Sequence, residues 1–164
     1  MRRILFAVIL VMACATGAAA GSCEDAKFNY DRYDYTKAAR LFRPLAEQGD
    51  AKAQFTLGMM YEKGQGTRRN CQTAMKYYRQ AAEQGHADSQ NKLGLLYEKG
   101  RRVQEDVRFA YMWYYVAAET LSGDDGRTAM KRRDIEASRM TAAQIGKAQG
   151  MARRCQQSQF KECD

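Results

Sequence analysis

The residue pattern closest to reactive chemistry in this chain is a serine followed three positions later by a lysine. Ser89-Gln90-Asn91-Lys92 has S-x-x-K spacing, in which one helical turn brings the lysine amine near the serine hydroxyl and can activate it as a nucleophile. The S-D-N and K-T-G motifs that accompany this arrangement are absent from the sequence. Ser89 also stands 36 residues after Ala53, so we expect its hydroxyl to lie in a helix contact. The sequence therefore predicts no catalytic residues and no enzyme.

Metal and cofactor chemistry also lack a supporting pattern. His86 is the only histidine, and no cysteine pair has the C-x-x-C spacing of a zinc site. The sequence contains no G-x-S-x-G, H-E-x-x-H or phosphate-loop glycine pattern. We expect neither a metal nor a cofactor.

The elements that would position any such residue are organised by a repeat of 36 residues. Ala38, Ala74 and Ala110 are spaced by 36, as are Phe42, Tyr78 and Tyr114. The residues that recur identically 36 positions later are Glu47, Gln48, Gly49, Ala51, Gln54, Leu57, Gly58, Tyr61, Glu62, Lys63 and Gly64. A period of this length is typical of stacked arrays, in which each unit covers the apolar face of its neighbour.

The recurring residues have the spacing of helices. Between Asp50 and Lys63, Ala53, Leu57 and Tyr61 follow one another every four positions and form one helical face. Gly58 lies beside them, where glycine costs up to about 1 kcal/mol relative to alanine. We expect this glycine to mark a close approach between two helices.

A second helix is predicted from Gln72 to Gln84, with Ala74, Tyr78 and Ala81 on the face that meets the first helix. The sequence therefore predicts an all-α superhelix, or solenoid, of antiparallel helix pairs with about eight helices in total.

The full unit reads A-x-x-Q-x-x-L-G-x-x-Y-x-x-G, then a short loop, then A-x-x-x-Y-x-x-A-A. This pattern resembles the Sel-one-like repeat, a relative of the tetratricopeptide repeat, from roughly Tyr33 to Ala118. We assign residues 21–121 to the repeat array and residues 122–164 to C-terminal capping helices. The last segment, with a T-x-x-Q capping box at Thr141 and Gln144, resembles the closing helices of exported members of this family.

The first 20 residues have the features of a signal peptide. Met1-Arg2-Arg3 is positively charged, Ile4 to Ala13 is apolar but too short to span a bilayer, and Ala18-Ala19-Ala20 is a small-residue cleavage site. Cleavage after Ala20 predicts a periplasmic or secreted chain that begins at Gly21 and has no integral membrane segment. The alternative is a membrane-anchored lipoprotein acylated at Cys14, because Val11 to Cys14 loosely resembles a lipobox.

Export would leave four cysteines in an oxidising compartment, and these permit three pairings. Cys155 closes a helical pattern and Cys163 lies eight residues later, past a polar turn; a cysteine-rich branch of the resembled family places disulfides at this separation. Cys155–Cys163 is the expected bond, and Cys23–Cys71 remains by elimination. Buried free thiols are the alternative.

The charge of the chain favours no nucleic-acid partner. Its formal net charge of +8 falls to +6 when Arg2 and Arg3 leave with the signal, and the remaining basic residues are spread along the chain among acids. Small basic clusters occur at Arg68-Arg69, Arg101-Arg102, Lys131-Arg132-Arg133 and Arg153-Arg154. We interpret them as solvated helix faces and loops, with a weak preference for anionic partners as the alternative.

A partner-binding surface is expected where the units differ, because the recurring positions serve packing. In tetratricopeptide-like arrays, one stripe of the first helix of each unit faces the concave groove. The groove residues predicted on this basis are Lys52, Phe55, Met59, Glu62, Asn91, Leu95 and Glu98. The alternative is that Phe55 and Met59 are core residues.

The resemblance implies an exported, non-catalytic scaffold or adaptor of the bacterial cell envelope that binds a protein or peptide in its concave groove. The second candidate is a cell-envelope enzyme or polymer binder that acts on beta-lactams or peptidoglycan. The sequence makes no prediction of the oligomeric state.

Overall fold

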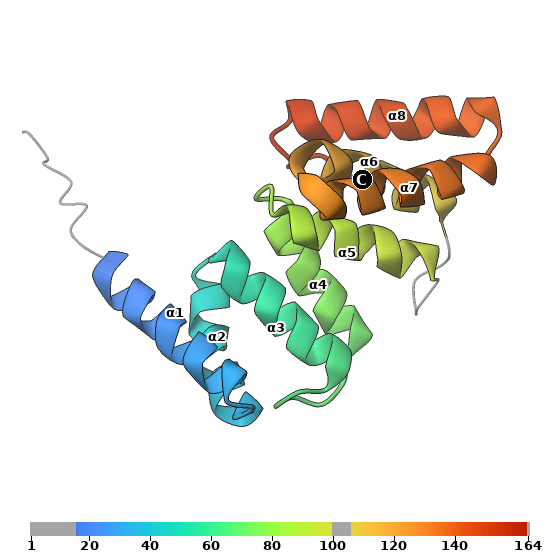
Figure 1. Cartoon of the computed structure of the whole chain (residues 1–164). Helices are drawn as coiled ribbons and strands as arrows, with labels where there is room; N and C mark the ends of the chain where they lie inside the picture. The colour runs from blue at the N-terminus through green and yellow to red at the C-terminus, as the bar shows by residue number, and fades with distance from the viewer. Residues whose placement is uncertain (1–15, 100–105, 164) are drawn as a thin grey trace, which may run out of the picture.

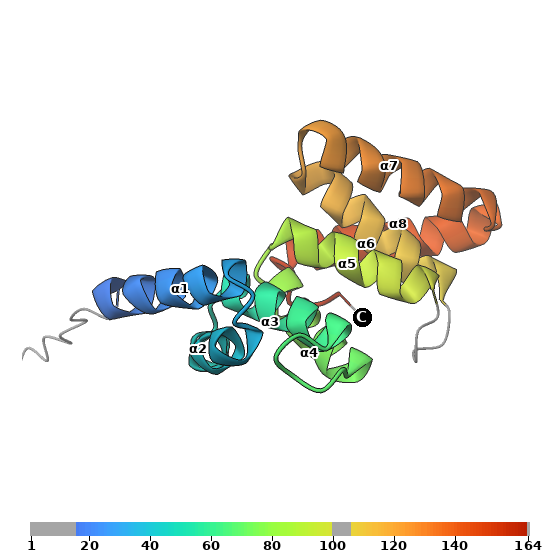
Figure 2. The same ribbon diagram turned by 60° about the horizontal axis from the view of Figure 1, so that its bottom comes forward.

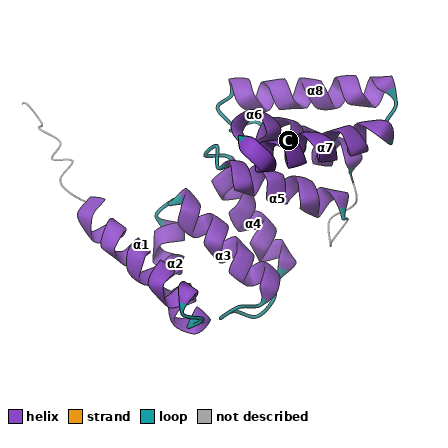
Figure 3. Ribbon diagram, viewed as in Figure 1, coloured by secondary structure: helices purple, strands orange, loops and turns teal. Residues whose placement is uncertain are grey.

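The computed structural model describes residues 16–99 and 106–163, with side chains from residue 24 onward. These residues form eight α-helices and no strand (Figure 3). The helices are α1 (Thr16–Asp31), α2 (Tyr35–Glu47), α3 (Ala51–Lys63), α4 (Cys71–Ala82), α5 (Ala87–Glu98), α6 (Val107–Thr120), α7 (Gly123–Ser138) and α8 (Ala142–Gln157). The predicted all-α architecture is confirmed.

The helices pack in chain order, as expected of a solenoid. α1 packs on α2, α3 on α2 and α4, and α5 on α4 and α6, while α6 also contacts both α7 and α8. Figure 1 shows α1 and α2 at one end of the array and the layer of α6, α7 and α8 at the other. The same succession is seen after a 60° rotation (Figure 2). No described helix has the length and apolar composition needed to cross a membrane.

Helix starts repeat with the same period as the packing residues. Asp34, Asn70 and Asp106 cap α2, α4 and α6, each accepting a hydrogen bond from a backbone N–H of the first turn. Asp50 and His86 cap α3 and α5 in the same way. The predicted capping box of Thr141 and Gln144 is present at the start of α8.

The close helix approach predicted at the recurring glycines is also present. A Cβ added to Gly58 would lie 2.8 Å from the ring of Tyr78 on α4, and one added to Gly94 would lie 2.7 Å from the ring of Tyr114 on α6. Both tyrosine side chains are fully buried. Each glycine therefore makes room for the aromatic ring that fills the interior of its unit.

The end of the array is closed by α8. Ala148, Ala152 and Cys155 on this helix are fully buried. Cys155 is bonded to Cys163, with their Cα atoms 4.4 Å apart, so the C-terminal segment folds back along α8. Chain-entropy models assign a bond that closes so short a loop about 2–3 kcal/mol of stabilisation.

Cys71 has a free, half-buried thiol in the structure, so the predicted Cys23–Cys71 bond is not seen there and the alternative of a free thiol applies to Cys71. Cys71 opens α4, which packs on α3 and α5, whereas Cys23 lies in α1, which packs on α2. The charged segment, the apolar segment and the lipobox cysteine Cys14 lie outside the described residues, and the expected cleavage after Ala20 falls within α1.

We expect Gly94→Ala to destabilise the protein although alanine is the better helix former. Overpacking against Tyr114 costs about 1–3 kcal/mol, more than the gain in helix propensity of up to about 1 kcal/mol. Gly146→Ala is the matched control, because Gly146 is exposed in α8 with nothing within 4 Å of its added Cβ. Urea unfolding should show a lower free energy for Gly94→Ala and an equal or higher one for Gly146→Ala; equal effects would contradict the packing role.

Candidate functional site

An apolar hollow lies between α1, α3 and the start of α5, beside the predicted stripe, and we call it the α1–α3 groove. Its volume is about 380 Å³. It is lined by Lys27, Tyr30 and Asp31 of α1, Phe42 of α2, Lys52, Phe55, Thr56 and Met59 of α3, and His86 and Asp88 at the start of α5. Three of the predicted groove residues, Lys52, Phe55 and Met59, are thus brought together on one surface.

Phe55 belongs to both the groove and the core. It is half-buried, and its ring centroid lies 4.9 Å from that of His86 and 5.8 Å from that of Tyr78. Met59 is likewise half-buried and packs on the same core cluster. These side chains form an apolar floor that the fold holds in place, so truncating them would disturb packing as well as the surface.

Charges of both signs surround that floor. Lys27 and Asp31 on α1, Lys52 on α3 and Asp88 on α5 are all exposed. A ligand with one apolar anchor and flanking charges of both signs fits this arrangement better than a uniformly charged polymer.

The contribution of α1 to the groove could not be read from the repeat, because the first unit has a shorter turn. Residues 32–34 join α1 to α2, whereas residues 64–70 join α3 to α4. Aligning the units at an offset of 36 residues therefore matches α2 with α4 but does not bring α1 into register with α3. The aromatic residues between Phe28 and Tyr35 were the signal that an additional helix face was present.

Glu62 and Glu98, also predicted to flank the groove, take part in recurring polar clusters instead. Glu62 accepts hydrogen bonds from the Tyr78 hydroxyl at 2.6 Å and from the Lys92 amine at 3.1 Å. Burial alone would raise the pKa of Glu62, but these two donors outweigh it and hold the pKa below its ordinary value. The carboxylate is therefore ionised and already partnered, and we leave it out of the contact surface.

The next unit contains a second cluster with the same arrangement. Glu98 accepts hydrogen bonds from the Tyr114 hydroxyl and from Arg132, whose Nη1 lies 3.2 Å away. Burial first, and the Glu98 carboxylate second, raise the pKa of Tyr114. Arg132 lies on α7. This helix therefore supplies the cation for Glu98, just as α5 supplies Lys92 for Glu62 in the preceding unit.

Asn91 and Leu95 lie farther along α5 and do not line the groove. Both are half-buried, and the Asn91 Oδ1 is buried without a hydrogen-bond partner among the described residues. The predicted set is thus divided: Lys52, Phe55 and Met59 line the groove, whereas the other four residues, on α3 and α5, lie outside it.

The S-x-x-K pair does not assemble as a catalytic unit. Ser89 is fully buried and its hydroxyl lies 3.1 Å from the Nδ1 of His86. Lys92 is directed to Glu62 and lies over the ring of Tyr78, with its Nζ 6.0 Å from the ring centroid. Ser89 therefore acts in the helix contact expected from its alignment with Ala53, and no substrate can reach its hydroxyl without displacing core residues. No group of three or more potential metal ligands occurs among the described residues.

The geometry of the units agrees with comparisons to known proteins. The sequence profile of the Sel1 repeat matches residues 29–50, 51–86 and 87–119. The chain belongs to the Sel1 repeat family. Sel1 repeats generally mediate protein–protein interactions. A search of curated proteins gave no match.

Two solved structures are similar over most of the chain. The first is c5321, a protective antigen present in uropathogenic Escherichia coli strains displaying an SLR fold, with 28% identity and a TM-score of 0.76. The second is a Sel1 repeat protein from Oxalobacter formigenes, with 30% identity and a TM-score of 0.59. Each match covers 89% of this chain, but only 30% of the first protein and 68% of the second.

His86 connects the groove to the stability of α5. Its Nδ1 accepts a hydrogen bond from the backbone N–H of Ser89 at 3.3 Å, which requires this nitrogen to be unprotonated. Burial lowers the pKa of His86, while Asp88 raises it to a smaller extent. Because the folded protein favours neutral His86, the stability from this group is present above its unfolded pKa of about 6.5 and is lost as pH falls below that value.

We therefore expect the melting temperature to decrease between about pH 7.5 and pH 5.5. His86→Asn retains a residue that caps helices well but does not titrate, so its melting temperature should decrease less over the same interval. Calorimetry of both proteins at the two pH values measures this difference. An equal decrease in the variant would show that protonation of His86 does not destabilise the fold.

Proposed function

We propose that this chain is an exported, non-catalytic scaffold of the bacterial cell envelope that binds a peptide or helix of a partner protein in the α1–α3 groove. Membership in the Sel1 repeat family supports the general role in protein interaction. The assignment of the binding site to the α1–α3 groove is proposed from the shape and side chains of the groove.

The observation that carries this proposal is the partly exposed apolar floor of the groove, which lies between charged side chains. The residue types at these positions differ from one unit to the next. Phe55 and Met59 correspond to Asn91 and Leu95 in the next unit, and Lys52 corresponds to Asp88. Because these positions are not fixed by the repeat, they are available for partner-specific contacts. A helix that places one apolar side chain on Met59 could pair its flanking charges with Lys27, Lys52 or Asp88.

The second candidate, an enzyme acting on beta-lactams or peptidoglycan, has no comparable support. Its only sequence signal was the S-x-x-K pair, and Ser89 and Lys92 hydrogen-bond to different groups. Turnover of nitrocefin by the purified chain would reopen this alternative.

Export is proposed from the N-terminal sequence alone. Cleavage after Ala20 should leave Gly21 as the first residue of the exported protein. N-terminal sequencing of material from a periplasmic fraction tests this expectation, and an acylated Cys14 at the N-terminus would identify a lipoprotein instead.

The groove can be blocked without removing a core side chain. Thr56 lines the groove and its hydroxyl donates to the backbone carbonyl of Lys52 at 2.9 Å. In Thr56→Arg, the long cationic side chain should occupy the hollow and weaken peptide binding at least about tenfold, which corresponds to about 1.4 kcal/mol. Peptides selected from a random library on the wild-type chain serve as the probe, with affinities measured by fluorescence anisotropy.

Thr120→Arg is the matched control, because Thr120 on α6 makes the same type of hydrogen bond, to the carbonyl of Val116. It lies outside the residues that line the groove and should bind the selected peptides with wild-type affinity. Equal affinities of wild type and Thr56→Arg, with unchanged circular dichroism, would rule out the groove as the binding site.

A further inference from the structure

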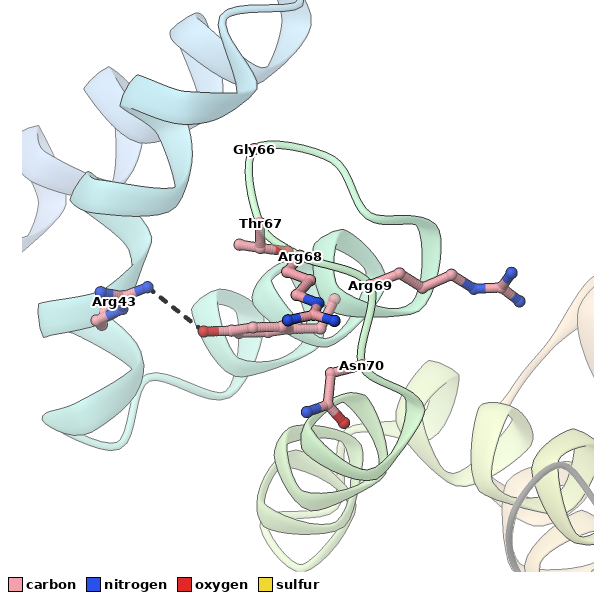
Figure 4. Close-up of a pocket in the computed structure, with 7 residues that line it drawn as sticks. Arg43, Gly66, Thr67, Arg68, Arg69 and Asn70 are labelled. Carbon is pink, nitrogen blue, oxygen red and sulfur yellow. Dashed lines mark hydrogen bonds between the residues drawn. The ribbon is translucent and has the colours of Figure 1, made fainter.

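A second pocket lies on the loop that joins α3 to α4, and its lining is basic. Its volume is about 540 Å³. Arg43 of α2, Tyr61 of α3 and the loop residues 66–70 line it, including Arg68 and Arg69 (Figure 4). The lining therefore carries three guanidinium groups and, among the described residues, no carboxylate.

The loop is held in place by α2 and α3. Gly66 has a φ of +64°, and a Cβ added to it would lie 2.1 Å from the backbone oxygen of Tyr35, so only glycine fits against the start of α2. The Thr67 hydroxyl donates to the carbonyl of Met60 at 3.2 Å, and the backbone N–H of Asn70 donates to the carbonyl of Tyr61 at 2.9 Å. The pocket is thus built before any ligand arrives, which lowers the entropic cost of binding.

Two of the three arginines are directed into the pocket. Figure 4 shows the side chains of Arg43 and Arg68 pointing inward and that of Arg69 extending away. The Nε of Arg69 donates to the carbonyl of Glu62 at 3.1 Å, so this residue contributes charge and fixes the loop. Arg68 forms no hydrogen bond or ion pair with another described residue.

Comparison with the next unit shows that Arg43 is loosely held. Arg79 occupies the equivalent position 36 residues later and lies 2.8 Å from the hydroxyl of Tyr97. Arg43 makes the corresponding contact to Tyr61 at 3.4 Å. Most of its N–H donors are therefore available to a ligand in the pocket.

We propose that this pocket binds a phosphate group. Two guanidinium groups from separate elements, together with the hydroxyl of Tyr61, present donors from several directions to one site. A carboxylate has two oxygens and one charge and is matched by a single arginine, whereas a phosphate offers more oxygens and up to two charges. The third guanidinium, from Arg69, adds long-range attraction for a dianion.

The phosphate can come from a soluble phosphate ester or from the headgroup of an anionic lipid, and the chemistry of recognition is the same. The site is separate from the α1–α3 groove, because the two share no lining residue. The Thr56→Arg variant should consequently retain phosphate binding, so failure of one proposal is distinguishable from failure of the other.

The test uses the ¹H–¹⁵N NMR spectrum of the purified chain titrated with inorganic phosphate at constant ionic strength. The backbone amides of residues 66–70 should shift saturably. Arg43→Gln/Arg68→Gln should weaken binding at least about tenfold, because it removes the two charged donors that are directed into the pocket. Arg153→Gln, at an exposed position of α8, is the matched charge control and should bind as wild type.

A parallel sedimentation assay with phosphatidylglycerol vesicles distinguishes the sources. Saturable binding of free phosphate that the double variant loses supports a soluble phosphate ester, and vesicle binding that only the double variant loses supports a lipid headgroup. The proposal is overturned if acetate produces the same shifts at the same concentrations as phosphate. It is also overturned if the double variant and Arg153→Gln match wild type in both assays.

Discussion

The contact between a helix glycine and the tyrosine ring of its partner helix sets the geometry of the array. At Gly58 and Gly94 the absence of a Cβ lets the rings of Tyr78 and Tyr114 enter the interior of their units. Each tyrosine hydroxyl then donates to a glutamate on the glycine-bearing helix, and a cation from the next unit completes the cluster. One glycine therefore determines the pairing of two helices and the position of a third.

This constraint separates packing positions from surface positions. Gly58 of α3 is committed to the contact with Tyr78 of α4, Leu57 is buried in the core that α3 shares with α1 and α2, and Glu62 is held by Tyr78 and Lys92. The face that carries Lys52 and Thr56 is left to form the α1–α3 groove. The loop after α3 is free to differ between units as long as it returns the chain to the cap of α4, and in this unit it carries the basic pocket.

The sequence predicted the array well because its packing residues and helix caps share a period. Asp34, Asn70 and Asp106 illustrate this agreement between local capping and the repeat. The site was predicted in part. Glu62 recurs as Glu98, and this recurrence was itself a sign of packing that the assignment to the groove overlooked. The cations Lys92 and Arg132 are 40 residues apart, so a search at 36 could not pair them. The shorter turn before α2 concealed the contribution of α1 to the groove, and cysteine counting could not show that Cys71 would keep a free thiol.

The separation of packing positions from binding positions is tested most directly by deep mutational scanning with two readouts, the amount of folded chain and the binding of peptides selected on the wild type. Substitutions at Gly58, Tyr78, Gly94 and Tyr114 should lower the folded amount. Substitutions at Lys27, Asp31, Lys52 and Thr56 should lower peptide binding and leave the folded amount near that of wild type. Peptide binding that tolerates every substitution in the second set, or folding that tolerates those in the first, would contradict this account.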